Sequence, residues 1–189
     1  MKKTEIIIIG TLHTGWTPHN KLIELIENID PDNILVELSK EELSTERRKT
    51  SIRDEMIAVH DWAIESGVPV STFDSENDIL REGITGTEPF FIEHGQQMKK
   101  ILKDYSWKDL NDDKPWNQPE IKRLDKKMNE KYIDPKKSAK RDIELVNSIK
   151  NLITEGKNVI LIGAGHLSFL EEYFSDAKFP LRKKTARNN

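Results

Sequence analysis

Two histidines stand in nearly the same phrase at opposite ends of the chain. Residues 6–13 read Ile-Ile-Ile-Ile-Gly-Thr-Leu-His, and residues 159–166 read Val-Ile-Leu-Ile-Gly-Ala-Gly-His. Four aliphatic residues in a row are typical of a strand buried on both faces of a sheet, and the glycine lets the backbone turn where the strand ends. Open α/β sheets bind ligands at the carboxyl ends of their strands. The sequence therefore predicts that the imidazoles of His13 and His166 share one site.

Two carboxylates are associated with further apolar runs. Glu37 interrupts the run at residues 34–38, and Asp74 follows the run at residues 68–73. A buried carboxylate needs a compensating partner, and a metal, an imidazolium or the guanidinium of Arg141 would each serve. Asp74 also has a simpler interpretation as a turn or N-cap residue, and Arg141 as a solvated helix charge.

Two imidazoles and a carboxylate are common ligands of divalent metals at sites with open positions, and zinc, manganese, iron and cobalt are all compatible. A metal held by His13, Glu37 and His166 would polarise a carbonyl and lower the pKa of a bound water, which gives a hydroxide nucleophile near neutral pH. Glu37 is alternatively the general base, with Asp74 as a ligand. A single histidine after a strand is more often a turn or hydrogen-bonding residue, so the matched context of the pair is what favours a site.

Trp16 lies in a loop three residues after His13. Its indole either shields the site or stacks on substrate, or it is a plain hydrophobic anchor. The sequence has no Gly-x-Ser-x-Gly elbow, no phosphate-binding loop and no dinucleotide fingerprint. Nucleophilic serine catalysis therefore has no support.

Apolar stretches with helical spacing separate the predicted strands, which indicates right-handed βαβ connections and a mainly parallel central sheet flanked by helices, an α/β fold. We expect Ile52 and Ile143 on the apolar faces of their helices, and Pro69 favours an edge position for its strand. The predicted helices span residues 18–29, 50–66, 136–155 and 167–174, and the predicted strands span residues 6–9, 33–38, 68–73 and 158–162.

Residues 80–135 have a different composition, in which aromatic, lysine and acidic residues mix and prolines recur. We expect two or three helices that form an inserted cap over the sheet edge, within a single domain spanning residues 1–189. In this interpretation the cap selects the substrate.

The composition excludes several classes of site and partner. The 189 residues include no cysteine, which excludes disulfides, thiolate zinc sites and a cysteine nucleophile and fits a reducing cytoplasm. A net charge of −3 gives no electrostatic reason to expect nucleic acid or an anionic membrane as partner. No apolar run reaches the length of a signal peptide or a membrane span. We therefore expect a cytoplasmic protein that acts on a small molecule or a peptide.

Four short motifs resemble the TraB/PrgY–Tiki–GumN group, which is related in fold to the erythromycin-esterase and ChaN-like proteins. The motifs are Gly-Thr-Leu-His at residues 10–13, Val-Glu-Leu at 36–38, Arg141-Asp142, and Gly-Ala-Gly-His-Leu at 163–167. The resemblance spans nearly the whole chain. It implies an α/β core and a site built from His13, Glu37 and His166, with Arg141 in support.

The activities implied by this resemblance are diverse. Tiki members resemble metal-dependent peptidases that use this His–Glu–His set, whereas erythromycin-esterase relatives use a histidine base without a required metal. ChaN-like relatives bind haem, and TraB/PrgY members are linked to the shutdown of peptide pheromones. Unlike Tiki proteins, this sequence has no signal peptide or membrane anchor, so an extracellular substrate is not expected. A homodimer is left open, because residues 179–181 are the only trace of a closing strand.

Three functions follow as hypotheses. The first is a metal-dependent hydrolase of an amide or ester bond, with His13 and His166 on the metal and Glu37 as ligand or base. The second is a metal-independent, esterase-like hydrolase in which an imidazole activates water beside Glu37. The third is a non-catalytic module that binds a peptide or haem.

Overall fold

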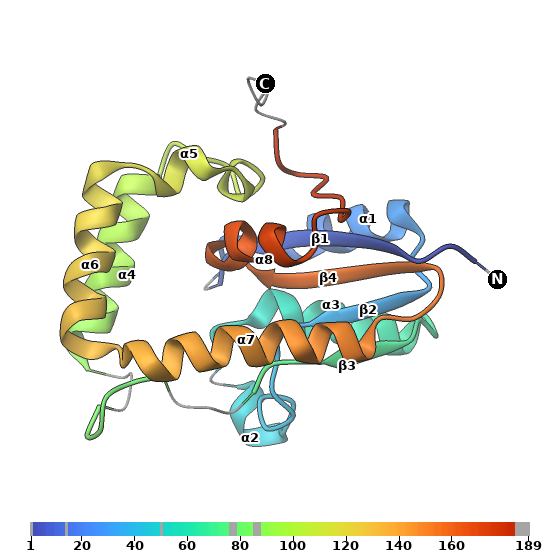
Figure 1. Ribbon diagram of the computed structural model, residues 1–189, viewed down its shortest axis with the longest axis horizontal. Helices are drawn as coiled ribbons and strands as arrows, with labels where there is room; N and C mark the ends of the chain where they lie inside the picture. Colours follow the sequence, from blue (N-terminus) through green and yellow to red (C-terminus); the bar gives the residue numbers. More distant parts are fainter. Residues whose placement is uncertain (1, 14, 50, 76–78, 85–87, 184–189) are drawn as a thin grey trace.

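Four parallel strands form the central sheet of the computed structural model, which describes residues 2–13, 15–49, 51–75, 79–84 and 88–183 (Figure 1). Within these residues the strand order is β1-β4-β2-β3, with helices against both faces, so the predicted α/β fold is confirmed. The strands are β1 (Glu5–Thr11), β2 (Asn33–Val36), β3 (Val70–Thr72) and β4 (Lys157–Gly163).

The two strands that carry the repeated phrase are direct neighbours. Gly10 of β1 stands opposite Ile162 of β4, and Thr11 opposite Gly163, so both strands end at the same edge of the sheet. On its other side β4 pairs with β2, which ends just before Glu37. β3 is an edge strand, as its Pro69 predicts.

Side chains alternate between the two faces of the sheet and build two separate cores. Ile7 and Ile9 point to one face, where they pack with α1 (His19–Ile29) and α3 (Asp54–Glu65). Ile8 points to the other face, which is covered by α7 (Pro135–Leu152) and α8 (Leu167–Tyr173). Because both faces are buried, the central runs of β1, β2 and β4 are continuously apolar rather than alternating, whereas the edge strand β3 reads Val-Ser-Thr and is partly buried.

Two details of the predicted helices are wrong. The helix expected over residues 50–66 begins at Asp54, so Ile52 lies ahead of it and is 58% exposed; residue 50 lies outside the described residues. The helix expected over residues 136–155 is α7, and its Ile143 is 54% exposed. Arg141 and Leu145 are buried, and Ile143 is two residues, about 200°, from each, which turns it to the opposite face.

The segment expected to form a cap contains two long antiparallel helices. They lie beyond the carboxyl ends of the strands, at one end of the molecule (Figure 1). They are α4 (Pro89–Leu102) and α6 (Pro119–Tyr132), joined through η1 (Asp109–Asn111) and α5 (Asp113–Trp116). Asn111 fixes this hairpin to β1, because its side-chain amide accepts from the Gly10 N–H at 2.8 Å and donates to the Gly10 carbonyl at 3.0 Å. A short helix, α2 (Thr45–Arg48), follows β2. In the described residues no helix combines the length and the apolar character needed to cross a membrane.

Candidate functional site

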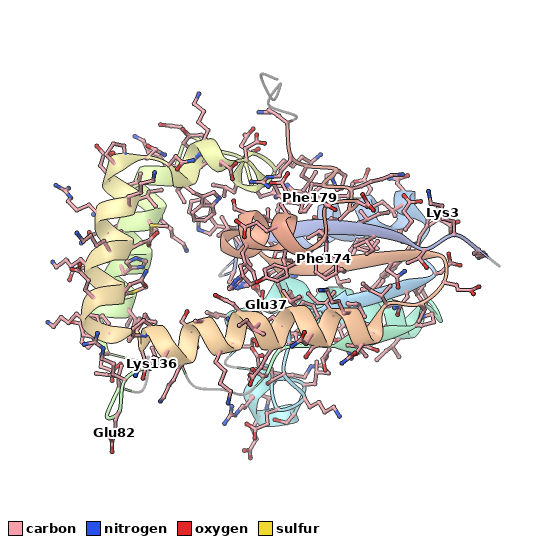
Figure 2. All side chains as sticks on the ribbon, in the orientation of Figure 1. Lys3, Glu37, Glu82, Lys136, Phe174 and Phe179 are labelled. Carbon is pink, nitrogen blue, oxygen red and sulfur yellow. The ribbon has the colours of Figure 1, made fainter. Side chains whose placement is uncertain are left out.

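A cleft of about 740 Å³ opens at the carboxyl ends of the strands. Five of the residues singled out in the sequence line it: His13, Glu37, Asp74, Arg141 and His166. Figure 2 shows Glu37 at this edge of the sheet, beside α7. The cleft is where the fold brings the two histidines and the predicted acids together.

Gly163 lies at the centre of this group. A methyl group built on its Cα would lie 3.4 Å from Oε2 of Glu37, 3.6 Å from Nε2 of His13 and 3.6 Å from Cδ2 of His166. The three predicted side chains therefore surround one point, and the absence of a side chain at Gly163 leaves that point open.

His13 is oriented by a carboxylate on α3. Its Nδ1 lies 2.8 Å from Oε1 of Glu55, which is fully buried and also accepts a hydrogen bond from the Thr11 hydroxyl at 2.8 Å. An ionised carboxylate only accepts, so with Glu55 ionised the hydrogen bond places a proton on Nδ1, and Nε2 is the ring nitrogen that faces Gly163. This is the arrangement of a general base with its orienting acid.

Glu55 was missed in the sequence analysis. A signal for it exists, because Glu55 stands four residues before the buried Val59 and therefore on the helix face that packs into the core. A carboxylate on such a face requires a buried partner in the same way as one in a strand.

Glu37 is 2% exposed and is surrounded by positive groups. Its Oε1 accepts from Nη2 of Arg141 at 2.9 Å, and its Oε2 accepts from the N–H of Gly163 at 2.6 Å. Burial by itself would raise the pKa of Glu37. The charges of His166, Arg53 and Arg141 and the Gly163 hydrogen bond outweigh burial and hold the pKa below its ordinary value. Glu37 is therefore a fixed anion and a poor proton acceptor.

Arg53 and Arg141 bind both Glu37 and Asp74. Arg141 donates to Asp74 at 2.9 Å as well as to Glu37, and Arg53 donates to Asp74 at 2.7 Å and to the Glu37 main-chain carbonyl at 2.7 Å. Burial lowers the pKa of Arg53, but Glu37, Asp74 and Glu42 raise it above its ordinary value, and the pKa of Arg141 is raised in the same way. Asp74 thus acts neither as a helix cap nor as a solvated turn residue, and Arg141 is not a solvated helix charge. Arg53, which gave no signal in the sequence, completes the cluster.

His166 lies between two carboxylates. Its Nε2 is 3.7 Å from Oε1 of Glu37, and its Nδ1 is 3.6 Å from Oδ1 of Asp142. Both distances exceed that of a hydrogen bond, so the ring is held less firmly than that of His13. A positive charge on this imidazole would be stabilised from both sides.

Trp16 lies away from the cleft lining. It packs against the small core of the helical hairpin, formed by Leu102, Leu110 and Ile121. Of the three interpretations left open by the sequence, this packing fits the hydrophobic anchor.

A divalent metal implied by the resemblance would need His13, Glu37 and His166 as ligands. In the part of the chain that the structure describes, no three His, Asp or Glu side chains are arranged to hold a metal ion. Both oxygens of Glu37 already accept hydrogen bonds, and the guanidiniums of Arg53 and Arg141 beside it oppose a second cation. The residues in this arrangement do not fit a resident metal, and the metal site stays a prediction.

No protein-family model, no curated protein and no solved structure matches this chain. The resemblance to the TraB/PrgY–Tiki–GumN group therefore rests on the sequence motifs, and it too stays a prediction.

Proposed function

We propose that this protein is a hydrolase that cleaves an amide or ester bond with water activated by His13. The hydrogen bond between Nδ1 of His13 and the buried Glu55, with Nε2 facing the cleft, supports this function best. A base must reach the proton that it removes before its pKa matters, and His13 meets the geometric condition.

In the reaction, water bound near Gly163 gives one proton to Nε2 of His13 while its oxygen attacks the substrate carbonyl carbon. The carbonyl π electrons move to oxygen and form a tetrahedral intermediate. When this collapses, the bond to the leaving oxygen or nitrogen breaks, and the imidazolium of His166 supplies the proton that the leaving group needs. His13 then returns its proton to solvent and His166 regains one.

Glu37 has a supporting role in this scheme. Its carboxylate stabilises the imidazolium of His166 across 3.7 Å, while Arg141 and Gly163 hold it in place. We give Glu37 neither the role of general base nor that of nucleophile, because its lowered pKa and its two hydrogen bonds make it a weak proton acceptor. Glu55 is a positioning residue that acts through His13.

The test is a screen of the purified, chelator-treated protein against p-nitrophenyl esters and a peptide library. We expect turnover of at least one substrate class that falls about 10²- to 10⁴-fold in His13→Ala, the usual contribution of a general base. His60→Gln, on the far part of α3, is the matched control and retains activity. Wild-type turnover that His13→Ala leaves unchanged would contradict the proposal.

A metal-dependent hydrolase is the second candidate, favoured by one observation. His13 Nε2 and the His166 ring both face the space beside Gly163, so two imidazoles border the same part of the cleft. Activity that is lost on chelation and restored by Mn²⁺, Co²⁺, Zn²⁺ or Fe²⁺ would replace the metal-free scheme by this one.

The non-catalytic alternative has its own signature. A saturable visible absorption band on adding haem, or tight peptide binding, combined with no turnover in the whole screen, would select a binding module.

A further inference from the structure

A second hollow, of about 590 Å³, lies at the far end of the helical hairpin. Figure 2 shows Glu82 and Lys136 at this end of the molecule, well away from Glu37 in the cleft. Five cationic side chains and one acid line the hollow: Arg81, Arg123, Lys126, Lys127, Glu130 and Lys131. The chain as a whole carries a net charge of −3, so this concentration of positive charge is local.

The spacing of the cations along α6 opposes helix stability. Arg123, Lys127 and Lys131 stand at i, i+4 and i+8, where side chains on one face of a helix are neighbours and like charges repel. Within the described residues, the side chains of Arg123 and Lys127 have no ionic or hydrogen-bonding partner. Lys126 is paired with Glu130, at 3.7 Å. Glu120 and Glu130 stand three residues from Arg123 and Lys127, but neither acid pairs with these two cations among the described residues.

Arg81 is brought into the same hollow from a different segment. Its guanidinium donates to the main-chain carbonyls of Glu130 at 2.5 Å and Ile133 at 3.3 Å. These bonds satisfy carbonyls at the carboxyl end of α6 and use two of the five N–H donors of Arg81. They explain why Arg81 is there, and cations in the last helical turn are also favoured by the helix dipole. Neither reason applies to Arg123 and Lys127, which lie nearer the middle of α6.

We propose that this hollow binds a small anion that carries two or more linked phosphoryl groups. The side chains that line the hollow are exposed and the hollow is open to solvent, so a ligand would be held there by charge rather than by enclosure. Guanidinium groups bind phosphate oxygens in pairs, and lysines add point charges of the same sign. The lining cations come from one stretch of α6 and from Arg81, a span too short to follow a long nucleic-acid strand, which favours a compact ligand. The site is independent of the cleft and of its reaction.

Isothermal titration of the full chain with sodium tripolyphosphate tests this inference. We expect saturable binding that weakens when NaCl is raised from 50 to 200 mM, because opposite charges are screened. Arg123→Gln/Lys127→Gln should weaken binding at least tenfold. Lys99→Gln/Lys100→Gln on α4 removes the same charge from the same hairpin and should weaken it less than twofold.

Two parallel titrations identify the source of the phosphoryl groups. ATP binding at least as tightly as tripolyphosphate would indicate a nucleotide, and weaker ATP binding would indicate an inorganic polyphosphate. Equal losses in the two double variants, or no saturable binding of either probe by the wild type at millimolar concentration, would overturn the inference. Circular dichroism of each variant checks that the hairpin is still folded.

Discussion

The two copies of the repeated phrase end in different environments although their residues nearly match. In the first copy the loop after Thr11 carries His13 to a hydrogen bond with the buried Glu55. In the second copy the chain passes from Gly163 directly into a 3-10 turn (Ala164–His166), and His166 lies between two carboxylates at more than 3.5 Å. A similar phrase therefore supplies one firmly oriented imidazole and one loosely held imidazole.

The glycines of the two copies differ in the same way. A Cβ at Gly10 would lie 2.7 Å from Leu167 Cδ1 and 3.0 Å from both Ala164 Cα and Asn111 Oδ1. A Cβ at Gly163 meets only ordinary contacts of 3.4 Å or more, all with side chains of the cleft. Gly10 is required for close packing, whereas Gly163 leaves room in the cleft. A repeated motif therefore need not have the same role in each copy.

The largest effect should come from the oriented imidazole. His13→Ala removes the proposed base, and we expect kcat to fall by about 10³-fold on the best substrate from the screen. His166→Ala should cost less, about 10- to 100-fold, because water can also protonate a leaving group of low basicity. Steady-state kinetics on substrates with good and poor leaving groups measures both.

The dependence on the leaving group is the diagnostic result. If His166 is the acid, the loss in His166→Ala should grow as the leaving group becomes more basic, whereas the loss in His13→Ala should not. Equal losses on every substrate would contradict the different roles given to the two copies.

Disruption of the ion cluster formed by Glu37, Asp74, Arg53 and Arg141 should have the next largest effect, in this case on stability. Arg141→Met leaves Arg53 as the one guanidinium beside Glu37 and Asp74 among the described residues, and we expect a loss of about 3 kcal/mol in the free energy of unfolding, the scale for breaking a buried pair. Urea denaturation measures this loss. Lys140→Met, one residue earlier on the exposed side of α7, is the control and should change stability by less than about 0.5 kcal/mol. Equal stability of the two variants would show that the cluster does not hold the edge together.

The paired glycines provide a sharper comparison. Gly10→Ala forces the Ala164 backbone and the Asn111 clamp apart, and we expect it to lower stability by about 1–3 kcal/mol, as overpacking does. Gly163→Ala should change stability by less than about 1 kcal/mol, but its methyl group would narrow the space beside His13 and His166 in which the water is proposed to bind, so activity should fall about tenfold or more. Thermal denaturation together with kinetics on the same samples separates the two losses. A stable Gly10→Ala protein would refute the packing role.

Sequence reasoning could predict the sheet and the meeting of its edges because those features depend on local patterns. Runs of four aliphatic residues identify buried strands, and parallel strands must end at one edge, which is enough to bring His13, Glu37 and His166 together. The order of the strands, with β4 between β1 and β2, is not contained in any such pattern.

The partners of the site residues were harder to predict for a physical reason. Glu55 and Arg53 contact His13 and Glu37 only because α3 packs across the sheet, and a contact between elements depends on tertiary geometry. The prediction that Ile143 lies on the apolar face of its helix was wrong for a related reason. The rotation of α7 that buries Arg141 beside Glu37 and Asp74 turns Ile143 to solvent. Hydrophobic periodicity assigns the apolar Ile143 rather than Arg141 to the buried helix face. That assignment is reversed here because Arg141 has buried acidic partners, which the sequence does not reveal.

The smallest expected effect is on the pH dependence of stability, and it tests the environment of Glu37 directly. Its folded pKa lies below the ordinary 4.5, so the folded state favours the ionised form. The resulting stabilisation is complete above the unfolded pKa and is lost as the pH falls through the folded value. Glu37→Gln removes this contribution. Below pH 4.5 the unfolding free energy of the variant should therefore fall less steeply with decreasing pH than that of the wild type. The two slopes should differ by at most about 1.4 kcal/mol per pH unit, the value for one proton.

Asp109 supplies the comparison, since the hydrogen bond from Lys183 lowers its pKa to about 2 at the exposed surface. Salt at 0.5 M should weaken the contribution seen on Asp109→Asn and leave that of Glu37 nearly unchanged, because buried charges are screened much less than exposed ones. Urea titrations between pH 2 and 6 at two salt concentrations measure both. If salt removes the Glu37 contribution as readily as that of Asp109, solvent ions reach the Glu37 carboxylate. Glu37 would then not be the buried, fixed anion that the proposed reaction needs to stabilise the imidazolium of His166.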